Sequence, residues 1–372
     1  MLFRSVGADG IFSPVHEELQ YNITDPKQFD PGTQLTLSPP FTDRRWDIEP
    51  SAYVQDQIAL GHWNLSAGLR FDHYGFAVNE SAWSPRIGIS RFLPSLNLLL
   101  HASYDRVFQT PAIENLLLAS STQLDSVSSL VLRIPVRPGR ANYYEAGFTK
   151  SLAGKLRIDG NAFRRNFRNF PDDDTLLDTG ISIPISFSTA HIYGEEIQIG
   201  VPHWNRFSGF VSYSNQTGTG QGPLSGGLFL GDKAANASDR SRFPISQDQR
   251  NTIRARVRVQ AAERMWFAVS AGYGSGLPVN LDKQIDLSQA LIQYGAAILD
   301  KVNFAAGRVR PNYSLDASGG ATFFHKENKD ISMQLEVSNL TNRVNVLNFA
   351  SLFSGTAVGP LRSASARLKL SF

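Results

Sequence analysis

The stretch Arg250-Asn-Thr-Ile-Arg-Ala-Arg-Val-Arg-Val-Gln-Ala261 alternates between apolar and polar side chains over most of its length. Its apolar positions are Ile253, Ala255, Val257 and Val259. The intervening positions are strongly charged and include Arg250, Arg254, Arg256 and Arg258. Because successive side chains of a β-strand point to opposite faces, this pattern predicts a strand with one oily face and one charged face.

The same alternation recurs along the whole chain, whereas helical periodicity is almost absent. Clear examples are residues 64–72, 96–105, 155–162 and 331–339. Several of these segments reach about 10 residues, longer than the usual globular strand of about 5–6 and long enough to cross a bilayer at a tilt. A soluble antiparallel sheet with one face on a core is the simpler alternative, but it does not require strands of this length.

The connections between the expected strands alternate between short and long. Tight turns are expected near residues 61–62, 93–95, 152–154, 202–203, 261–263 and 324–330, and long excursions at 109–140, 169–186, 217–246, 276–309 and 342–360. Residues 77–82 form a short connection where this rhythm predicts a long one. A transmembrane β-barrel has tight turns at one rim and long loops at the other. The sequence therefore predicts an all-β, antiparallel transmembrane β-barrel with short periplasmic turns and long extracellular loops.

Aromatic residues near the strand ends are expected to form the two interfacial girdles of such a barrel. They are Trp63, Tyr74, Trp83, Phe92, Tyr104, Phe108, Trp204 and Trp266.

The C-terminus supports the same interpretation. Apolar residues occupy every second position of the last strand, at Ala364, Ala366, Leu368, Leu370 and Phe372. A final strand of this kind, ending on an aromatic residue, is typical of the signal that bacterial outer-membrane barrels present to the barrel assembly machinery. Ala366, Leu368, Leu370 and Phe372 are the residues expected to carry it, and an ordinary edge strand is the alternative.

Several short stretches, in order, resemble the TonB-dependent outer-membrane receptors. They are Tyr53-Val-Gln-Asp-Gln57, Leu65-Ser-Ala-Gly-Leu-Arg-Phe-Asp72, Ser84-Pro-Arg-Ile-Gly88, Tyr104-Asp-Arg-Val-Phe-Gln-Thr-Pro111, Tyr144-Glu-Ala-Gly147, Tyr193-Gly-Glu-Glu196, Asp248-Gln-Arg250, Gly272-Tyr-Gly-Ser-Gly-Leu-Pro278 and Asn339-Leu-Thr-Asn-Arg343. The resemblance covers residues 50–372. Residues 349–360 are similar to receptors that carry a carboxypeptidase-like regulatory domain.

Barrels of this family have about 22 strands. Counting backwards from Phe372 predicts about thirteen strands, with a further strand at residues 18–24 followed by an external loop at 25–46. Residues 1–46 are thus expected to hold a partial strand and an extracellular loop, and 47–372 the regular strands of the C-terminal part of the barrel. No signal peptide, TonB-contacting box or plug domain is found in the sequence.

The resemblance implies energised uptake of a scarce ligand across the outer membrane. Outer-membrane lipid is an expected partner, whereas TonB and a plug domain are expected only for the complete receptor. The ligand, a small molecule or a glycan, is not identified by any residue. The alternative is a passive channel formed by a closed barrel of about 14 strands.

Enzyme and cofactor chemistry find little support. The chain has no Cys and seven dispersed His, and it lacks the common catalytic motifs, so neither a catalytic nor a metal site nor a cofactor is expected. An outer-membrane hydrolase is disfavoured because no Ser/His/Asp constellation is evident. Asp172-Asp-Asp174 could hold Ca²⁺, although a solvated acidic loop is the favoured interpretation. The net charge of +3 does not predict nucleic-acid binding.

The charged faces hold the candidate functional residues. Arginines expected to face the barrel lumen are Arg70, Arg157, Arg165, Arg250, Arg254, Arg256 and Arg258. In a plugged receptor such residues hold the plug by ion pairs, and in an open pore they favour anions; general lumen polarity is an equal alternative. Ligand capture is expected at the external loops 109–140, 217–246 and 276–309.

Overall fold

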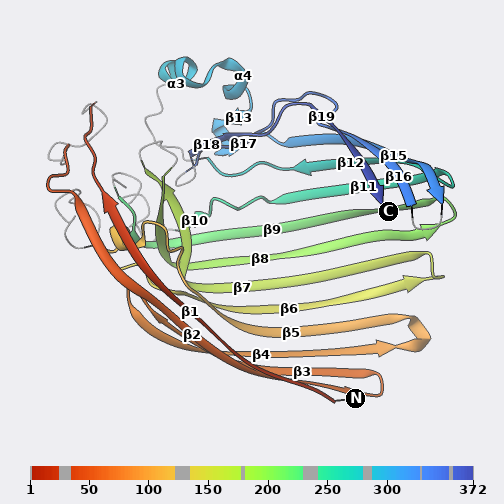
Figure 1. Cartoon of the computed structure of the whole chain (residues 1–372), viewed down its shortest axis with the longest axis horizontal. Helices are drawn as coiled ribbons and strands as arrows, with labels where there is room; N and C mark the ends of the chain where they lie inside the picture. The colour runs from red at the N-terminus through yellow and green to blue at the C-terminus, as the bar shows by residue number, and fades with distance from the viewer. Residues whose placement is uncertain are drawn as a thin grey trace.

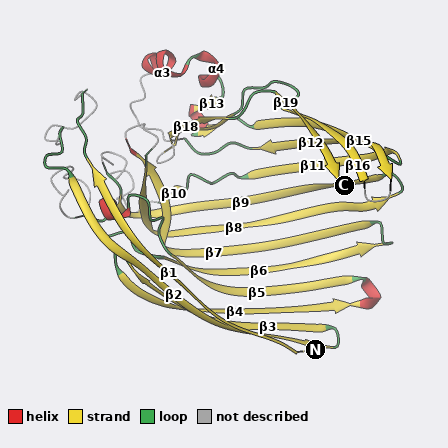
Figure 2. Cartoon of the chain, in the orientation of Figure 1, coloured by secondary structure: helices red, strands yellow, loops and turns green. Residues whose placement is uncertain are grey.

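The computed structural model describes residues 2–24, 35–121, 135–176, 181–228, 242–279, 287–326, 329–351 and 355–371. One curved antiparallel sheet of 15 strands dominates it (Figure 1). The helices are short and lie in the connections at the strand ends (Figure 2). The all-β antiparallel fold expected from the alternation is therefore confirmed.

Neighbours in the chain are almost always neighbours in the sheet. The strands on its main path are β1 (Leu2–Leu19), β2 (Phe41–Leu60), β3 (Trp63–Gly75), β4 (Asn79–Leu93), β5 (Leu98–Gln109), β6 (Gly139–Leu152), β7 (Leu156–Thr175), β8 (Ser182–Trp204), β9 (Phe207–Gly226), β11 (Asn251–Ala262), β12 (Met265–Gly274), β15 (Asn312–Lys326), β16 (Lys329–Ser338) and β19 (Ser363–Ser371). This meander makes β1 and β19 the two edges of the sheet.

The remaining elements belong to the connections. They are α1 (Leu116–Ala119), β10 (Phe243–Pro244), α3 (Leu287–Tyr294), α4 (Ala296–Leu299) and the small hairpins β13 (Val302–Asn303) with β14 (Arg308–Val309) and β17 (Val346–Ser351) with β18 (Gly355–Val358). Strand β10 pairs with the outer end of β9. No helix in the described part of the chain is long and apolar enough to cross a membrane.

The register sorts the side chains into two faces. Val257 of β11 lies opposite Val269 of β12, which lies opposite Ala317 of β15. On the other face, Arg254 lies opposite Ser212 of β9. Apolar residues thus meet apolar residues from strand to strand, and polar residues meet polar ones. We call these two sides of the sheet the apolar face and the polar face.

The polar face is the concave one. Arg70 and Tyr74 lie on the same face of β3, and the buried Tyr74 packs in one cluster with Leu116 and Leu117 of α1. Helix α1 also contacts β1, β2 and β8, strands that are far apart in the sheet. A single short helix can touch all of them only on the inside of the curve, so the apolar face is convex and exposed.

The two rims of the sheet differ as expected. Short turns join β2 to β3, β6 to β7 and β11 to β12 at one end, and the longer connections lie at the other end (Figure 1). The turn expected at residues 202–203 is displaced, because β8 continues to Trp204 and the turn is formed by Asn205 and Arg206. A register irregularity between Val201 and Trp204 accommodates the added residues.

The prediction for the N-terminal strand was wrong. The structure places β1 at Leu2–Leu19, paired with β2 from Leu2 opposite Ile58 to Leu19 opposite Phe41. Residues 18–24 contribute only the end of β1 and an isolated bridge from Asn22 to Thr36. Gly7, Gly10 and Pro14 interrupt the alternation of β1. The side-chain pattern therefore does not indicate a strand here, although the backbone is paired along its whole length.

Several predicted loops are instead strand extensions. Strands β7 and β8 continue as a ladder to Thr175 opposite Ser182, within the loop expected at 169–186. Strand β9 reaches Gly226, within the loop expected at 217–246. The segment 342–360 contains the β17–β18 hairpin. Residues 122–134, 177–180, 229–241, 280–286 and 352–354 lie outside the described residues.

Three aromatic residues expected in the girdles lie elsewhere, one of them Phe92, which shares the polar face of β4 with Arg86 and Ser90. Tyr74 is 1% exposed beneath α1 on the polar face. Trp266 shares the polar face with its cross-strand neighbour Gln260, and Arg258 stacks on its ring at 4.6 Å.

The two faces predict opposite responses to an added charge on adjacent residues of β12. Val269→Lys places an ammonium on the apolar face in the middle of the strand, and we expect it to cost about 2–4 kcal/mol of unfolding free energy in a bilayer. Ser270→Lys, on the polar face, should change that free energy by much less. Urea titration of the membrane-inserted protein measures both; equal losses would contradict the assignment of the faces.

Candidate functional site

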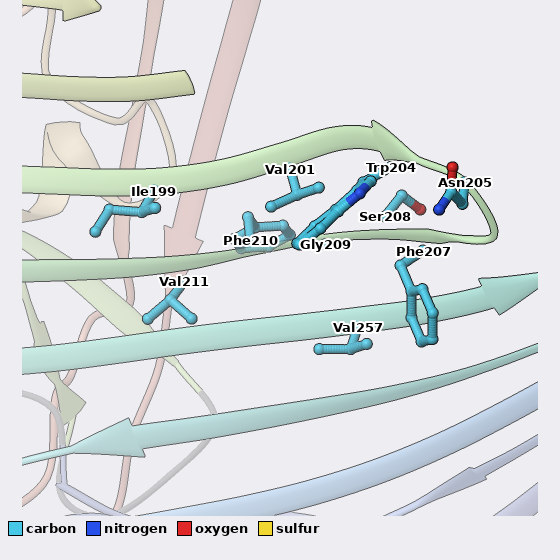
Figure 3. Close-up of a pocket in the computed structure, with 10 residues that line it drawn as sticks. All are labelled: Ile199, Val201, Trp204, Asn205, Phe207, Ser208, Gly209, Phe210, Val211 and Val257. Carbon is cyan, nitrogen blue, oxygen red and sulfur yellow. The ribbon is translucent and has the colours of Figure 1, made fainter. Parts of the chain in front are cut away.

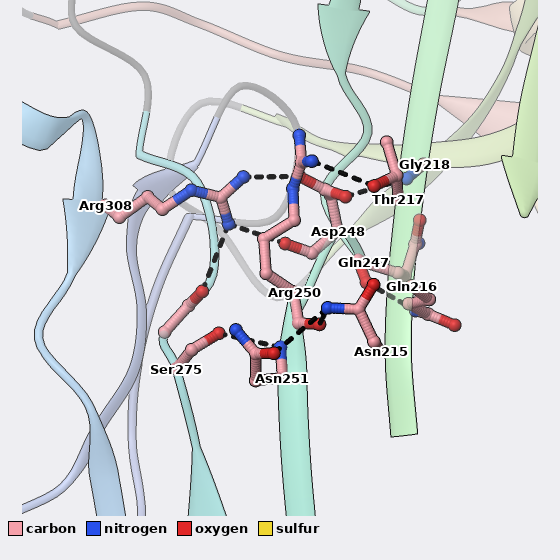
Figure 4. A network of polar contacts seen from close by, with 11 residues as sticks. Asn215, Gln216, Thr217, Gly218, Gln247, Asp248, Arg250, Asn251, Ser275 and Arg308 are labelled. Atoms are coloured by element: carbon pink, nitrogen blue, oxygen red, sulfur yellow. Dashed lines mark hydrogen bonds and ion pairs between the residues drawn. The ribbon is translucent and has the colours of Figure 1, made fainter. Parts of the chain in front are cut away.

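An ion-pair network centred on Asp248 joins the strands to the long connections (Figure 4). The side chain of Asp248 is 0% exposed, and the residue lies in the segment between β10 and β11. Its carboxylate accepts a hydrogen bond from the backbone N–H of Gly218 at 2.7 Å and one from Nε of Arg250 at 2.9 Å. It is also paired with Arg308. A buried carboxylate is stable only with such compensation.

Arg308 brings a distant part of the chain to this point. It lies in β14, at the end of the connection that carries α3 and α4. One Nη donates to the Asp248 carboxylate and the other to the Asp248 carbonyl at 2.7 Å and the Gly276 carbonyl at 3.2 Å. The arginine therefore holds both ends of the 276–309 connection against the start of β11.

Arg250 completes the network on the other side. Its Nη1 donates to Thr217 Oγ1 of β9 at 2.8 Å, while its carbonyl accepts from Asn215 Nδ2 at 3.1 Å. Two of the connections expected to capture ligand, 217–246 and 276–309, are thus tied together through one carboxylate. Arg250 therefore holds two connections together. Its place among the arginines expected to face the lumen did not predict this role.

Arg157 and Arg254 line one polar hollow on the concave face, with a volume of about 820 Å³. Amide side chains supply much of the remaining lining: Asn161, Gln198, Gln216, Gln247 and Gln249. Arg157 is paired with Asp159 at 2.8 Å. The hollow combines fixed charges with adaptable hydrogen-bonding groups, so it can bind a polar surface.

The other predicted arginines are not gathered there. Arg70 pairs with Asp72 at 2.6 Å and donates to Ser51 at 2.8 Å. Arg165 stacks on the rings of Phe163 at 4.8 Å and Tyr143 at 5.2 Å. Arg256 and Arg258 share the polar face of β11 with Arg254, as expected from the alternation. The functional role of this set stays a prediction.

The predicted C-terminal signal lies on the apolar face of the edge strand β19. Ala366 lies opposite Leu335 and Leu368 opposite Met333. Leu368 is 65% exposed and Leu370 51%, while Phe372 lies outside the described residues. Their part in barrel assembly stays a prediction.

A second contact orders the connection that follows β5. Glu17, near the outer end of β1, accepts hydrogen bonds from the backbone N–H groups of Leu117 at 3.1 Å and Leu118 at 2.9 Å. Burial raises the pKa of this carboxyl, and the same N–H groups oppose the rise. The described part of the 109–140 connection is therefore packed onto β1 and not free in solvent.

The acidic triplet 172–174 is part of strand β7, which corrects the prediction of a solvated loop. Asp172 accepts from Ser246 Oγ at 2.9 Å and from Gln247 Nε2 at 3.3 Å, and Asp174 is buried. Burial raises the pKa of Asp172. Among the described residues, no three His, Cys, Asp or Glu side chains gather as metal ligands.

Comparison with known proteins agrees with this architecture. Residues 6–340 match the family described as TonB dependent receptor-like, beta-barrel. Among solved structures, the copper transporter OprC has a TM-score of 0.65 at 14% identity, covering 100% of this chain and 54% of that one. The unliganded ferric citrate transporter FecA has a TM-score of 0.63 at 17% identity, with coverages of 100% and 51%. The ferripyoverdine receptor of Pseudomonas aeruginosa has 0.62 at 13%, with 99% and 46%.

The long two-faced strands and the sorted rims define an antiparallel β-barrel wall of the outer-membrane type. The chain belongs to the TonB-dependent receptor β-barrel family. It spans about half the length of the solved proteins that it matches. The family is one of receptors and transporters of the Gram-negative outer membrane and not of enzymes. The finer resemblance to receptors with a carboxypeptidase-like domain stays a prediction.

Sequence reasoning noted Asp248 only as part of a family-like motif, and Arg250 both in that motif and among the arginines expected to face the lumen. It missed Arg308, which is 60 residues from Asp248 along the chain, and it missed the contact of Glu17 with α1. An isolated acid, flanked by two glutamines and followed by Arg250 between two long connections, was the available signal.

Removing the central carboxylate should loosen two connections together. Asp248→Asn leaves Arg250 and Arg308 without their ion pair, and since Arg250 remains 40% exposed, we expect a loss of up to about 3 kcal/mol. Hydrogen exchange should accelerate at residues 272–279 and 308–312. Arg256→Gln, on the same strand, is the control and should leave exchange there unchanged; unaltered protection in Asp248→Asn would refute the role of the network.

Asp172 predicts a pH dependence of stability at the outer end of β7, beyond the membrane-spanning part. Its folded pKa is raised above the ordinary 3.8, so its contribution to stability is fully present below that ordinary value and is lost as pH rises through the raised pKa. Asp172→Asn should therefore flatten the pH profile of unfolding and be no less stable than the parent at neutral pH. The exposed Asp300→Asn serves as control, and an unchanged profile in Asp172→Asn would argue against this assignment.

Proposed function

We propose that this chain forms the barrel wall of a receptor that takes up a scarce ligand with energy supplied through TonB. The observation that carries the proposal is the sheet itself, with its exposed apolar face, its polar concave face and its sorted rims, in a chain whose residues 6–340 match the receptor barrel family. The solved neighbours carry ferric citrate, ferripyoverdine and copper according to their descriptions. At their level of identity they do not select a ligand for this chain.

A passive channel of about 14 strands is not favoured. Such a channel requires its first strand to pair with its last, whereas β1 and β19 are the opposite ends of the sheet order. Unpaired strand edges are not stable in hydrocarbon. We infer that further strands, outside the sheet described here, close the barrel in the membrane.

The polar hollow and the Asp248 network support separate functions for the extracellular rim and the lumen. The connections tied by Asp248 are the proposed site of ligand capture at the extracellular rim. The lumen-facing groups, including Arg157 and Arg254, are the proposed contacts for a plug domain and for the ligand on its way inward. TonB and the plug are partners of the complete receptor, and the last strand is the proposed contact of the barrel assembly machinery.

The test is uptake by cells whose complete receptor contains this chain. Growth under limitation should first identify the ligand from a panel of ferric chelates, cobalamin and glycans. We expect accumulation of that ligand to fall to background when TonB is deleted, because the barrel has no energy source of its own. Accumulation that persists without TonB, at the rate of passive entry, would overturn the proposal in favour of a channel.

A further inference from the structure

An apolar groove lies on the convex face where β8, β9 and β11 approach the short-turn rim. It has a volume of about 520 Å³, within the range of about 300–1,000 Å³ of ligand pockets. Figure 3 shows its lining gathered beside the turn that joins β8 to β9, with β11 alongside. The side chains that matter most are Ile199, Val201, Trp204, Phe207, Val211 and Val257.

Two features of the sequence create this groove. Gly209 lies between Val201 of β8 and Val257 of β11 in the register, so the centre of the groove has no side chain. A Cβ at this position would collide with the carbonyl oxygen of Arg256. The register irregularity between Val201 and Trp204 then places the indole at the end of the groove, where it is 53% exposed.

A lysine lies beside the mouth of the groove. Nζ of Lys155, in the neighbouring turn between β6 and β7, lies 5.9 Å from the centre of the Trp204 ring. Arg206 lies in the turn between β8 and β9, but its side chain lines the polar hollow on the other side of this turn, where its Nη1 donates to the Ala261 carbonyl at 3.3 Å. That polar hollow has a volume of about 460 Å³ and also contains His203, Arg258 and Glu263, so its two arginines outnumber its one acid.

An apolar groove with Lys155 beside the tryptophan at its end, and with Arg206 in the adjoining turn, suits a molecule with a hydrocarbon chain and an anionic head. The short-turn rim is the periplasmic one in this family, so the groove opens into the periplasmic leaflet. We propose that it is a binding site for an anionic glycerophospholipid, with an acyl chain along Gly209 and the phosphate at Lys155 and Arg206. The site needs only the position of the barrel in the membrane and does not depend on ligand uptake.

The test uses the fluorescence of Trp204 in the membrane-inserted full receptor. In a variant that keeps Trp204, phenylalanine replaces the other tryptophans of the chain, Trp46, Trp63, Trp83 and Trp266. The receptor is placed in bilayer discs of phosphatidylethanolamine that contain a minor fraction of phosphatidylglycerol with brominated acyl chains. The bromine atoms quench the fluorescence of Trp204 on contact. A surface cation enriches anionic lipid on the order of fivefold, so half-maximal quenching should occur at a correspondingly lower fraction of phosphatidylglycerol than of brominated phosphatidylethanolamine.

Matched variants separate the two parts of the site. Lys155→Gln and Arg206→Gln should each remove about one such fivefold factor, while Val257→Phe should block the chain and remove the preference altogether. Ala317→Phe, which fills a different apolar hollow on β15, is the packing control. A variant that keeps only Trp83, on the convex face at the other rim, reports insertion and general lipid contact.

Equal quenching by the two lipids at Trp204, with normal quenching at Trp83, would overturn the proposal. A preference that survives both Lys155→Gln and Arg206→Gln would also overturn it, because the selectivity would then not come from the groove. Uptake measured in the same variants is a separate readout, so failure of the lipid site and failure of the receptor function can be told apart.

Discussion

The pairing of backbone N–H and C=O groups in hydrocarbon is the constraint on which the rest of this structure depends. No water is available there to satisfy these groups, so a strand in a membrane must be hydrogen-bonded on both sides. The meander from β1 to β19 meets this requirement for every strand between its edges. Because pairing fixes the register, it also decides which side chains share a face, and a shift by one residue would turn Arg254, Arg256 and Arg258 toward lipid. The two-faced character of the sheet is a consequence of the ladder.

This constraint explains which parts of the fold could be predicted from sequence. Within the hydrocarbon the side chains must alternate, so segments such as Arg250–Ala261 can be predicted as strands from the sequence. The positions of the short turns between them can then be predicted from the strand ends. Beyond the membrane the backbone still pairs, but the side chains no longer have to alternate. The outer parts of β7, β8 and β9 contain Pro171, Asp172, Gly222 and Pro223 and therefore resemble loops, although ladder bonds continue through them. Strand β1 was missed for a different reason, because Gly7, Gly10 and Pro14 interrupt its alternation although it pairs with β2 along its whole length.

The candidate site was less predictable because it rests on contacts between distant residues. The alternation placed Arg254, Arg256 and Arg258 on one face correctly, but it did not show that Asp248 would be buried beside Arg250 or that Arg308, 60 residues away, would reach the same carboxylate. A long connection has no periodicity that records where it packs. Its position is decided by a few strong interactions, here the Asp248 ion pairs and the acceptance of the Leu117 and Leu118 N–H groups by Glu17.

The same ladder that creates the polar path also creates the groove on the convex face. A glycine in a strand leaves a gap on whichever face it occupies, and at Gly209 the neighbouring Arg256 carbonyl leaves no space for a Cβ. On the concave face such gaps are bordered by polar groups and can admit water. On the convex face the gap is bordered by Val201 and Val257, so water would be unsatisfied there and hydrocarbon fills it at lower cost. Close strand packing thus produces a place where the surrounding lipid, and not the protein, must complete the surface. Lys155 and Arg206, in the adjoining turns, then determine which lipid is preferred.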